Sequence, residues 1–209
     1  MSEHAVSLSW QRIDAWLAVH APATLALLEP PVAPEELEAA QRVLGVQFPV
    51  ELCESLRCHN GVSQWASLLP EQSPLGAAGI AEHWRMCLEI ASDNDGLVAR
   101  PGDDEPWWHP LWVPWAESAD GNAQVIDLRP GSEPGRLGWA GHSGGGDFSD
   151  QWPGLAPFLH EVAQALYRGS GVRDMYPYLT SDGQLWWDLG KNCQDLNGEP
   201  LTAAPAGLG

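Results

Sequence analysis

Apolar residues recur at helical spacing in five segments of the chain, and this periodicity predicts amphipathic helices. The segments are residues 9–20, 34–44, 49–59, 78–91 and 153–168. Pro34 opens the second segment and Gly45 follows its end, which fits a first-turn proline and a left-handed helix cap. Because only a short turn separates the second and third segments, these two helices are expected to form a hairpin.

A strand-like pattern follows the fourth helical segment. Residues 111–116, 123–128 and 136–140 form three short runs that are rich in apolar residues. The turn former Asp120-Gly121-Asn122 lies between the first two runs. These runs therefore predict an antiparallel meander.

Further strands are predicted on either side of this meander. Residues 62–69 predict one short strand. Near the C-terminus, residues 176–179 and 185–189 predict a β-hairpin with Asp182-Gly183 as its two-residue turn. The last residues are rich in Ala, Pro and Gly and are expected to be frayed.

Composition narrows the classes of function. The chain has 209 residues, 44% of them apolar, which is enough for one hydrophobic core. Ten Lys and Arg residues against 28 Asp and Glu residues give a net charge of −18. This balance argues against nucleic-acid binding, which depends on clustered Lys and Arg. An acidic surface either only keeps the protein soluble or also steers a basic partner toward it.

Three features bear on the cellular location. The chain has no run of about 18 apolar residues, so no membrane-spanning helix is expected. The start of the chain lacks the basic and apolar segments of a signal peptide. The four cysteines, at positions 53, 58, 87 and 193, are too few and too scattered for a disulfide scaffold. A cytoplasmic location is therefore expected.

Residues 92–110 form the least regular part of the chain and predict a long loop, a kind of segment that is often functional. Its acidic and aromatic residues are the candidate partner-binding residues Asp93, Asp95, Asp103, Asp104, Glu105, Trp107 and Trp108. In one interpretation the carboxylates meet basic residues of a partner protein and the two indoles act as anchors. In the alternatives the loop is only solvated, or the Trp pair only caps the sheet.

Two short motifs suggest metal ions, and neither is complete. Asp93-Asn94-Asp95-Gly96 resembles the start of a calcium loop, but the ninth position is Pro101 and the twelfth is Asp104 in place of Glu. Cys58-His59 has two zinc-binding residue types, but no second pair follows at ligand spacing. We therefore expect no metal and no cofactor.

Gly141-His142-Ser143-Gly144-Gly145 fits the pattern of a hydrolase nucleophile elbow. That motif requires a helix directly after the serine, whereas a flexible glycine turn follows Ser143. Only one histidine, His160, lies downstream. A serine hydrolase using Ser143 is thus a less favoured interpretation than a glycine-rich connection between a strand and the last helix.

Several short motifs occur in a fixed order along the chain. They are Trp10 with Trp16-Leu17, Pro34-Glu35-Glu36-Leu37 leading to Leu44-Gly45-Val46, Phe48-Pro49-Val50-Glu51-Leu52, His59-Asn60-Gly61, residues 111–115, Val125-Ile126-Asp127-Leu128-Arg129-Pro130-Gly131, and Phe158-Leu159. In this order they resemble the SUKH superfamily, specifically the Smi/Knr-like branch of cell-wall-assembly regulators and their bacterial homologues.

The resemblance implies an α+β fold in which helices pack around a mostly antiparallel sheet. The C-terminal β-hairpin goes beyond the family pattern and is expected to be an extension of this fold. It covers roughly residues 9–168, expected to form one Smi/Knr-like domain. Residues 169–200 are expected to pack on this domain as the hairpin extension, and residues 201–209 to form a frayed tail. The resemblance further implies no catalytic residues. It implies binding to a protein partner, either a toxin neutralised by an immunity protein or the target of a regulatory or scaffolding protein.

Overall fold

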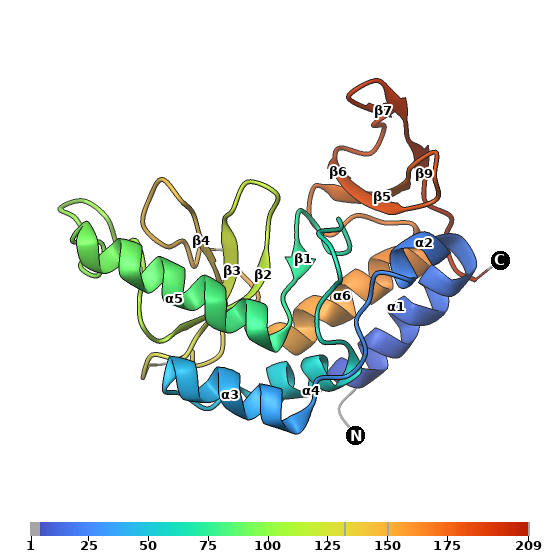
Figure 1. Cartoon of the computed structure of the whole chain (residues 1–209). Coiled ribbons are helices and arrows are strands. Elements are labelled where there is room, and N and C mark those ends of the chain that lie inside the picture. Colours follow the sequence, from blue (N-terminus) through green and yellow to red (C-terminus); the bar gives the residue numbers. More distant parts are fainter. Residues whose placement is uncertain (1–4, 132, 150, 209) are drawn as a thin grey trace.

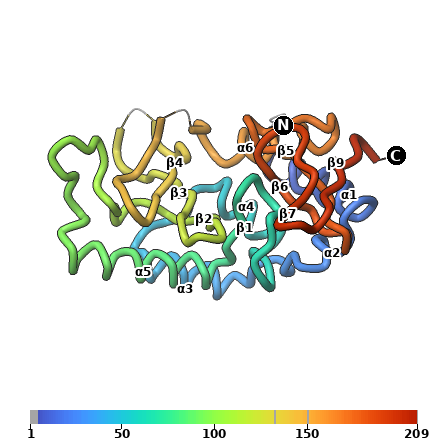
Figure 2. The backbone as a smooth tube through the Cα atoms, turned by 90° about the horizontal axis from the view of Figure 1, so that it is seen from above, coloured from blue at the N-terminus to red at the C-terminus, as the bar shows by residue number. Residues whose placement is uncertain are grey.

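The α+β fold is confirmed by a computed structural model, which describes residues 5–131, 133–149 and 151–208 (Figure 1). Helices cover a four-stranded antiparallel sheet, and smaller antiparallel sheets follow at the C-terminal end of the chain. The loop after helix α5 and the C-terminal strands lie at opposite ends of the molecule, as both views show (Figures 1 and 2).

The helices form where the apolar periodicity predicts them. Their bounds are α1 Val6–His20, α2 Pro22–Leu25, α3 Pro34–Leu44, α4 Val50–Cys58, α5 Ala77–Asp93 and α6 Leu155–Arg168. The predicted cap after α3 is also confirmed, because Gly45 has a φ of 71° and its N–H donates to the carbonyl of Gln41. Only the short α2 lies outside the predicted segments.

The main sheet contains the predicted meander. Its strands are β1 Ser73–Pro74, β2 Trp112–Glu117, β3 Ala123–Asp127 and β4 Leu137–Ala140, paired in that order and all antiparallel. The register of β2 shifts between Pro114 and Ala116, where a bulge accommodates a proline that has no N–H to donate.

Two helical layers bury this sheet. Helix α5 crosses beside β2 and packs on α3, whereas α1 and α6 pack on each other (Figures 1 and 2). Trp115 of β2 and Phe158 of α6 meet edge to face at 5.6 Å between ring centroids. Both rings are 1% exposed, so they join the sheet to the second helical layer in the core.

The predicted strand at residues 62–69 is wrong. This segment forms only isolated bridges, from Val62 to Leu28 and from Leu69 to Gln72. Its hydrogen bonds are local and irregular: the N–H of Leu68 donates to the carbonyl of Ala66, and the N–H of Ala66 donates to the Oγ of Ser73 at 3.2 Å. Residues 66–70 are buried without interruption, which explains why their apolar run resembled a strand.

The turn at Asn60-Gly61 fixes the helices around this segment. The Asn60 side chain donates to the carboxylate of Glu36 in α3 and accepts from the N–H of Ala77 at the start of α5. Gly61 has a φ of 78° and lies directly against Gly76, where a Cβ on Gly61 would come within 2.3 Å of the Gly76 nitrogen. The contact therefore requires glycine.

The C-terminal β-hairpin extension is confirmed. It consists of β5 Met175–Leu179 and β6 Leu185–Leu189, and β9 Thr202–Ala203 pairs with β5. A separate small hairpin is formed by β7 Asp195–Leu196 and β8 Glu199–Pro200.

Buried hydrogen bonds attach this extension to the rest of the chain. The indole N–H of Trp187 donates to the carbonyl of Leu68 at 3.1 Å, and the Trp187 backbone N–H donates to Ser67 Oγ at 3.0 Å. Strand β6 is thus joined to the segment before β1.

The predicted two-residue turn of this hairpin is wrong, because the turn has three residues. The N–H of Thr180 donates to the carbonyl of Gln184, and Gly183 takes a φ of 78°. The β2–β3 turn repeats this geometry: Ser118 donates to Asn122, and Gly121 has a φ of 84°. In both turns the Asp before the glycine accepts from the Ser or Thr hydroxyl, which stabilises a type I turn followed by a left-handed glycine.

The last residues pack more closely than the frayed tail expected for residues 201–209. Leu201 is buried, β9 pairs with β5, and the Trp16 indole donates to the carbonyl of Pro205 at 3.1 Å. His20 also contacts the carbonyl of Gly207 at 2.8 Å. These contacts join the tail to α1, and Gly209 lies outside the described residues.

Candidate functional site

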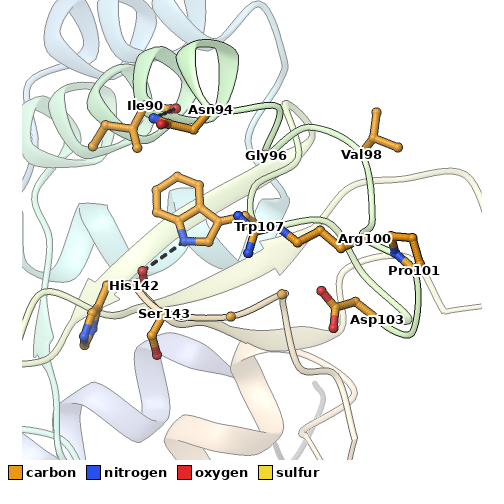
Figure 3. Close-up of a pocket in the computed structure, with 12 residues that line it drawn as sticks. Ile90, Asn94, Gly96, Val98, Arg100, Pro101, Asp103, Trp107, His142 and Ser143 are labelled. Carbon is orange, nitrogen blue, oxygen red and sulfur yellow. Dashed lines mark hydrogen bonds between the residues drawn. The ribbon is translucent and has the colours of Figure 1, made fainter.

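A pocket of about 500 Å³ opens where the long loop after α5 meets the glycine-rich segment after β4 (Figure 3). It is lined by Ile90, Asn94, Gly96, Val98, Arg100, Pro101, Asp103, Trp107, His142, Ser143, Gly144 and Gly145. The predicted partner-binding loop therefore does form a concave surface.

Trp107 spans this pocket. Its indole lies between the end of α5 and the glycine-rich segment, and its N–H donates to the carbonyl of His142 at 3.2 Å (Figure 3). The residue is half-buried, so one part of the ring packs on the protein while another part remains accessible. Of the two adjacent indoles predicted as anchors, Trp107 is the accessible one.

The structure corrects the prediction that Trp108 is an anchor for a partner. Trp108 is only 1% exposed and cannot present its ring to a partner. The ring packs edge to face against Trp112 at 6.0 Å and lies 6.2 Å from the ring of His83. Consecutive loop residues point to opposite sides here, so Trp108 anchors the loop to the core while Trp107 faces the pocket.

Glu105 is a second correction, since its carboxylate is engaged within the protein. Both of its oxygens accept from the guanidinium of Arg129, at 2.6 and 2.9 Å. Arg129 also donates to Asp127, whose side chain is 5% exposed. Such a bidentate pair fixes the geometry of both partners. Glu105 therefore tethers the loop instead of facing a partner.

Two arginines, Arg129 and Arg136, form ion pairs with two carboxylates, those of Asp127 and Glu105. Burial alone would raise the pKa of Asp127, but hydrogen bonds and positive charge from Arg129, with a further bond from Arg136, lower it. The pKa of Arg129 is raised by its hydrogen bonds to Glu105 and Asp127. Together these four side chains hold the base of the loop.

The remaining predicted carboxylates, Asp93, Asp95, Asp103 and Asp104, are all exposed. Of these only Asp103 lines the pocket, across from the end of α5 (Figure 3). Exposed carboxylates also occur away from this loop, at Glu35, Glu38, Glu82, Asp174, Asp182, Asp195 and Glu199. The negative charge is thus spread over the described surface and is not confined to the loop.

Comparison with known families identifies the domain. The model of the SMI1 / KNR4 family (SUKH-1) matches residues 31–161, more than half of the chain. The chain belongs to this family. No curated protein matches it. The matched region contains the whole pocket and ends within α6, so the C-terminal strands lie beyond it.

Ser143 of this SUKH-1 chain lies in a turn and not at a nucleophile elbow. Among the described residues after Ser143, no helix begins before α6 at Leu155. The glycines around it have a packing role instead: a Cβ on Gly145 would come within 2.4 Å of the Glu105 carbonyl oxygen, and one on Gly146 within 2.3 Å of the Trp112 ring. The motif is therefore explained by close approach of the backbone to the loop.

The structure brings no metal-binding set together in the part of the chain that it describes: no group of three or more His, Cys, Asp or Glu side chains is placed to hold an ion. Asn94 turns its amide back to the carbonyl of Ile90 at 2.8 Å. The Nε2 of His59 lies 3.0 Å from the Asp14 carboxylate, and burial raises the pKa of the Cys58 thiol to about 11. These groups have structural contacts in the SUKH-1 domain.

Two features of the SUKH-1 domain were not predicted from the sequence. One is the role of Arg129 and Arg136 as tethers of the loop, for which the only signal was a charged Asp127 at the end of an apolar strand. The other is the separation of the two adjacent indoles. Among the described residues, no helix is both long enough and apolar enough to cross a membrane.

Proposed function

We propose that this chain is a non-enzymatic protein-binding domain whose partner is a basic protein. The best specific case is an immunity protein that binds and neutralises a toxin domain in the cytoplasm. The observation that carries the proposal is the SUKH-1 match over residues 31–161 in a chain with a net charge of −18. Nucleic acid and membranes remain disfavoured as partners, because the acidic surface would repel both phosphate and anionic lipid.

The proposed contact surface is the pocket beside the long loop. Trp107 offers a large, rigid ring that is already held by His142, so little side-chain freedom is lost on binding. In this proposal, Lys or Arg residues of the partner meet Asp103 on the pocket wall and the exposed Asp93, Asp95 and Asp104, which are nearby in the sequence. Neutralisation would follow if the bound domain covered the active site of the toxin.

Long-range attraction predicts a strong effect of salt on binding. Raising the salt from about 0.1 M to about 1 M shortens the Debye length from about 10 Å to about 3 Å. The rate of association with a basic toxin domain encoded beside this gene should therefore fall at least tenfold, as surface plasmon resonance would measure. An association rate that did not change with salt concentration would contradict the proposed electrostatic attraction of the partner. Stable binding only to a non-toxin protein would instead identify a regulatory or scaffolding role.

Substitutions in the pocket should weaken the same complex. Trp107→Ala is expected to raise the dissociation constant at least tenfold, because an aromatic anchor is lost. Asp103→Asn should raise it about threefold by removing one rim charge. Asp174→Asn, an equal loss of charge at an exposed residue outside the pocket, serves as the matched control. If Asp174→Asn weakened binding as much as Asp103→Asn, only total charge would matter and the pocket would have no role.

A further inference from the structure

A second groove, of about 330 Å³, lies where the β2–β3 turn, the segment before β1 and strand β6 meet. Its walls are unusually aromatic, with Trp65, Trp139 and Trp186 all half-buried along it. The rings of Trp65 and Trp186 meet edge to face at 6.0 Å between centroids. The groove is thus formed jointly by the SUKH-1 domain and the strands beyond residue 161.

Three carboxylates, those of Glu71, Asp120 and Asp188, line the same groove. Asp188 is held beside a ring, because the indole N–H of Trp186 donates to it at 3.2 Å. Asp120 accepts from Ser118 and Asn122 of its own turn. Glu71 has no hydrogen-bond or ion-pair partner among the described residues, and its backbone takes a φ of 60°.

These carboxylates are close enough to interact unfavourably. Desolvation raises the pKa of Glu71, and the negative charges of Asp120 and then Asp188 raise it further. None of the Lys and Arg residues in the described chain lines the groove to compensate. The groove therefore combines uncompensated negative charge with indole faces.

Two other partly exposed aromatic residues of the chain each have an arginine over the ring. The guanidinium of Arg173 lies 3.8 Å from the ring centroid of Trp152, and that of Arg12 lies 4.5 Å from Tyr167. Across the described residues, no cation lies over Trp65, Trp139 or Trp186. A cation over an indole face is attracted by the ring, and a neighbouring carboxylate adds to this attraction.

We propose that this groove receives an arginine side chain of the partner protein. Arginine fits better than lysine, because its planar guanidinium stacks on indole rings and is weakly hydrated, and because it forms hydrogen bonds to several carboxylates at once. The inference rests on the proposed function only in taking the partner to be a basic protein. It adds a specific contact, at a surface that the family match covers only in part.

The test uses a small probe, N-acetyl-arginine amide, with the uncharged N-acetyl-citrulline amide as its matched control. In NMR spectra of the full chain, the arginine probe should shift the indole N–H signals of Trp65, Trp139 and Trp186 saturably. A dissociation constant on the order of millimolar is expected for a single side chain. The signal of Trp152, which is already covered by Arg173, should stay unchanged.

The two similar turns provide matched variants. Asp120 and Asp182 occupy the same position in turns with the same hydrogen bonds, but only Asp120 lines the groove. Asp120→Asn should raise the dissociation constant of the probe about threefold, and Asp182→Asn should leave it unchanged. Glu71→Gln, which removes no hydrogen bond, should act like Asp120→Asn. Equal shifts with citrulline, equal effects of the two Asp variants, or no shift at all would overturn the inference.

This experiment separates the two proposals, because the probe requires no partner protein. If a basic partner binds while arginine leaves the groove signals unchanged, the inference about the groove fails and the proposed function stands. If arginine binds in the groove while no basic protein binds the chain, the inference about the groove stands and the proposed function fails.

Discussion

Replacing Gly61 by alanine is expected to destabilise the fold by about 4 kcal/mol, or to prevent folding altogether. Two costs combine, since a φ of 78° is unfavourable for alanine and the new Cβ would lie 2.3 Å from the Gly76 nitrogen. Backbone atoms on the other side of this contact belong to the start of α5 and cannot rotate away. Urea unfolding followed by circular dichroism would measure the loss.

Gly45→Ala is the matched control for this prediction. Gly45 also has a positive φ, 71°, but a Cβ there would meet nothing within 4 Å. Its substitution should therefore cost only about 1 kcal/mol, the conformational part alone. Similar losses in the two variants would mean that the close contact between Gly61 and Gly76 contributes nothing.

Arg129→Ala is expected to lower the free energy of unfolding by about 3 kcal/mol. The change leaves the carboxylates of Asp127 and Glu105 with Arg136 as their remaining cation, at 3.3 and 3.6 Å. Because the Asp127 side chain is only 5% exposed, water cannot replace the lost guanidinium well. The loop that Glu105 tethers should also open, and amide hydrogen exchange around Trp107 should become faster.

The pH dependence of this loss follows from Asp127. Its pKa is lowered in the folded protein, so its contribution is present above the unfolded pKa of about 3.9 and is lost as the pH falls through the folded pKa. The difference between wild type and Arg129→Ala should therefore be full at neutral pH and shrink below about pH 4. Arg42→Ala, which breaks only an exposed pair with Glu38, should change stability by less than about 0.5 kcal/mol at any pH.

The helices and the meander could be predicted because their signals are local. Leu37, Ala40 and Leu44 share one buried face of α3, as their spacing requires, and Gly45 ends the helix by its own backbone preference. The prediction for residues 62–69 failed for a physical reason: buried strands and buried irregular segments show the same apolar run. The contacts of Ala66 with Ser73 and of Ser67 with Trp187 cannot be read from that run.

The candidate site was predictable only in outline. The acidic and aromatic composition of residues 92–110 indicated a functional loop. The sequence does not indicate which of two adjacent tryptophans faces the core, and in the structure Trp108 is the buried one. The inward pairing of Glu105 depends on Arg129, a residue 24 positions away. The groove beside Trp186 was missed entirely, because its walls come from five separate parts of the chain.

The contact between the first helix and the final residues has a consequence for synthesis on the ribosome. Trp16 donates to Pro205, and His20 contacts Gly207, across separations of 189 and 187 positions. The face of α1 that these residues cover must wait until residues 205–207 have emerged from the exit tunnel. Nascent chains should therefore complete this corner of the fold only after the meander at residues 112–140 has closed.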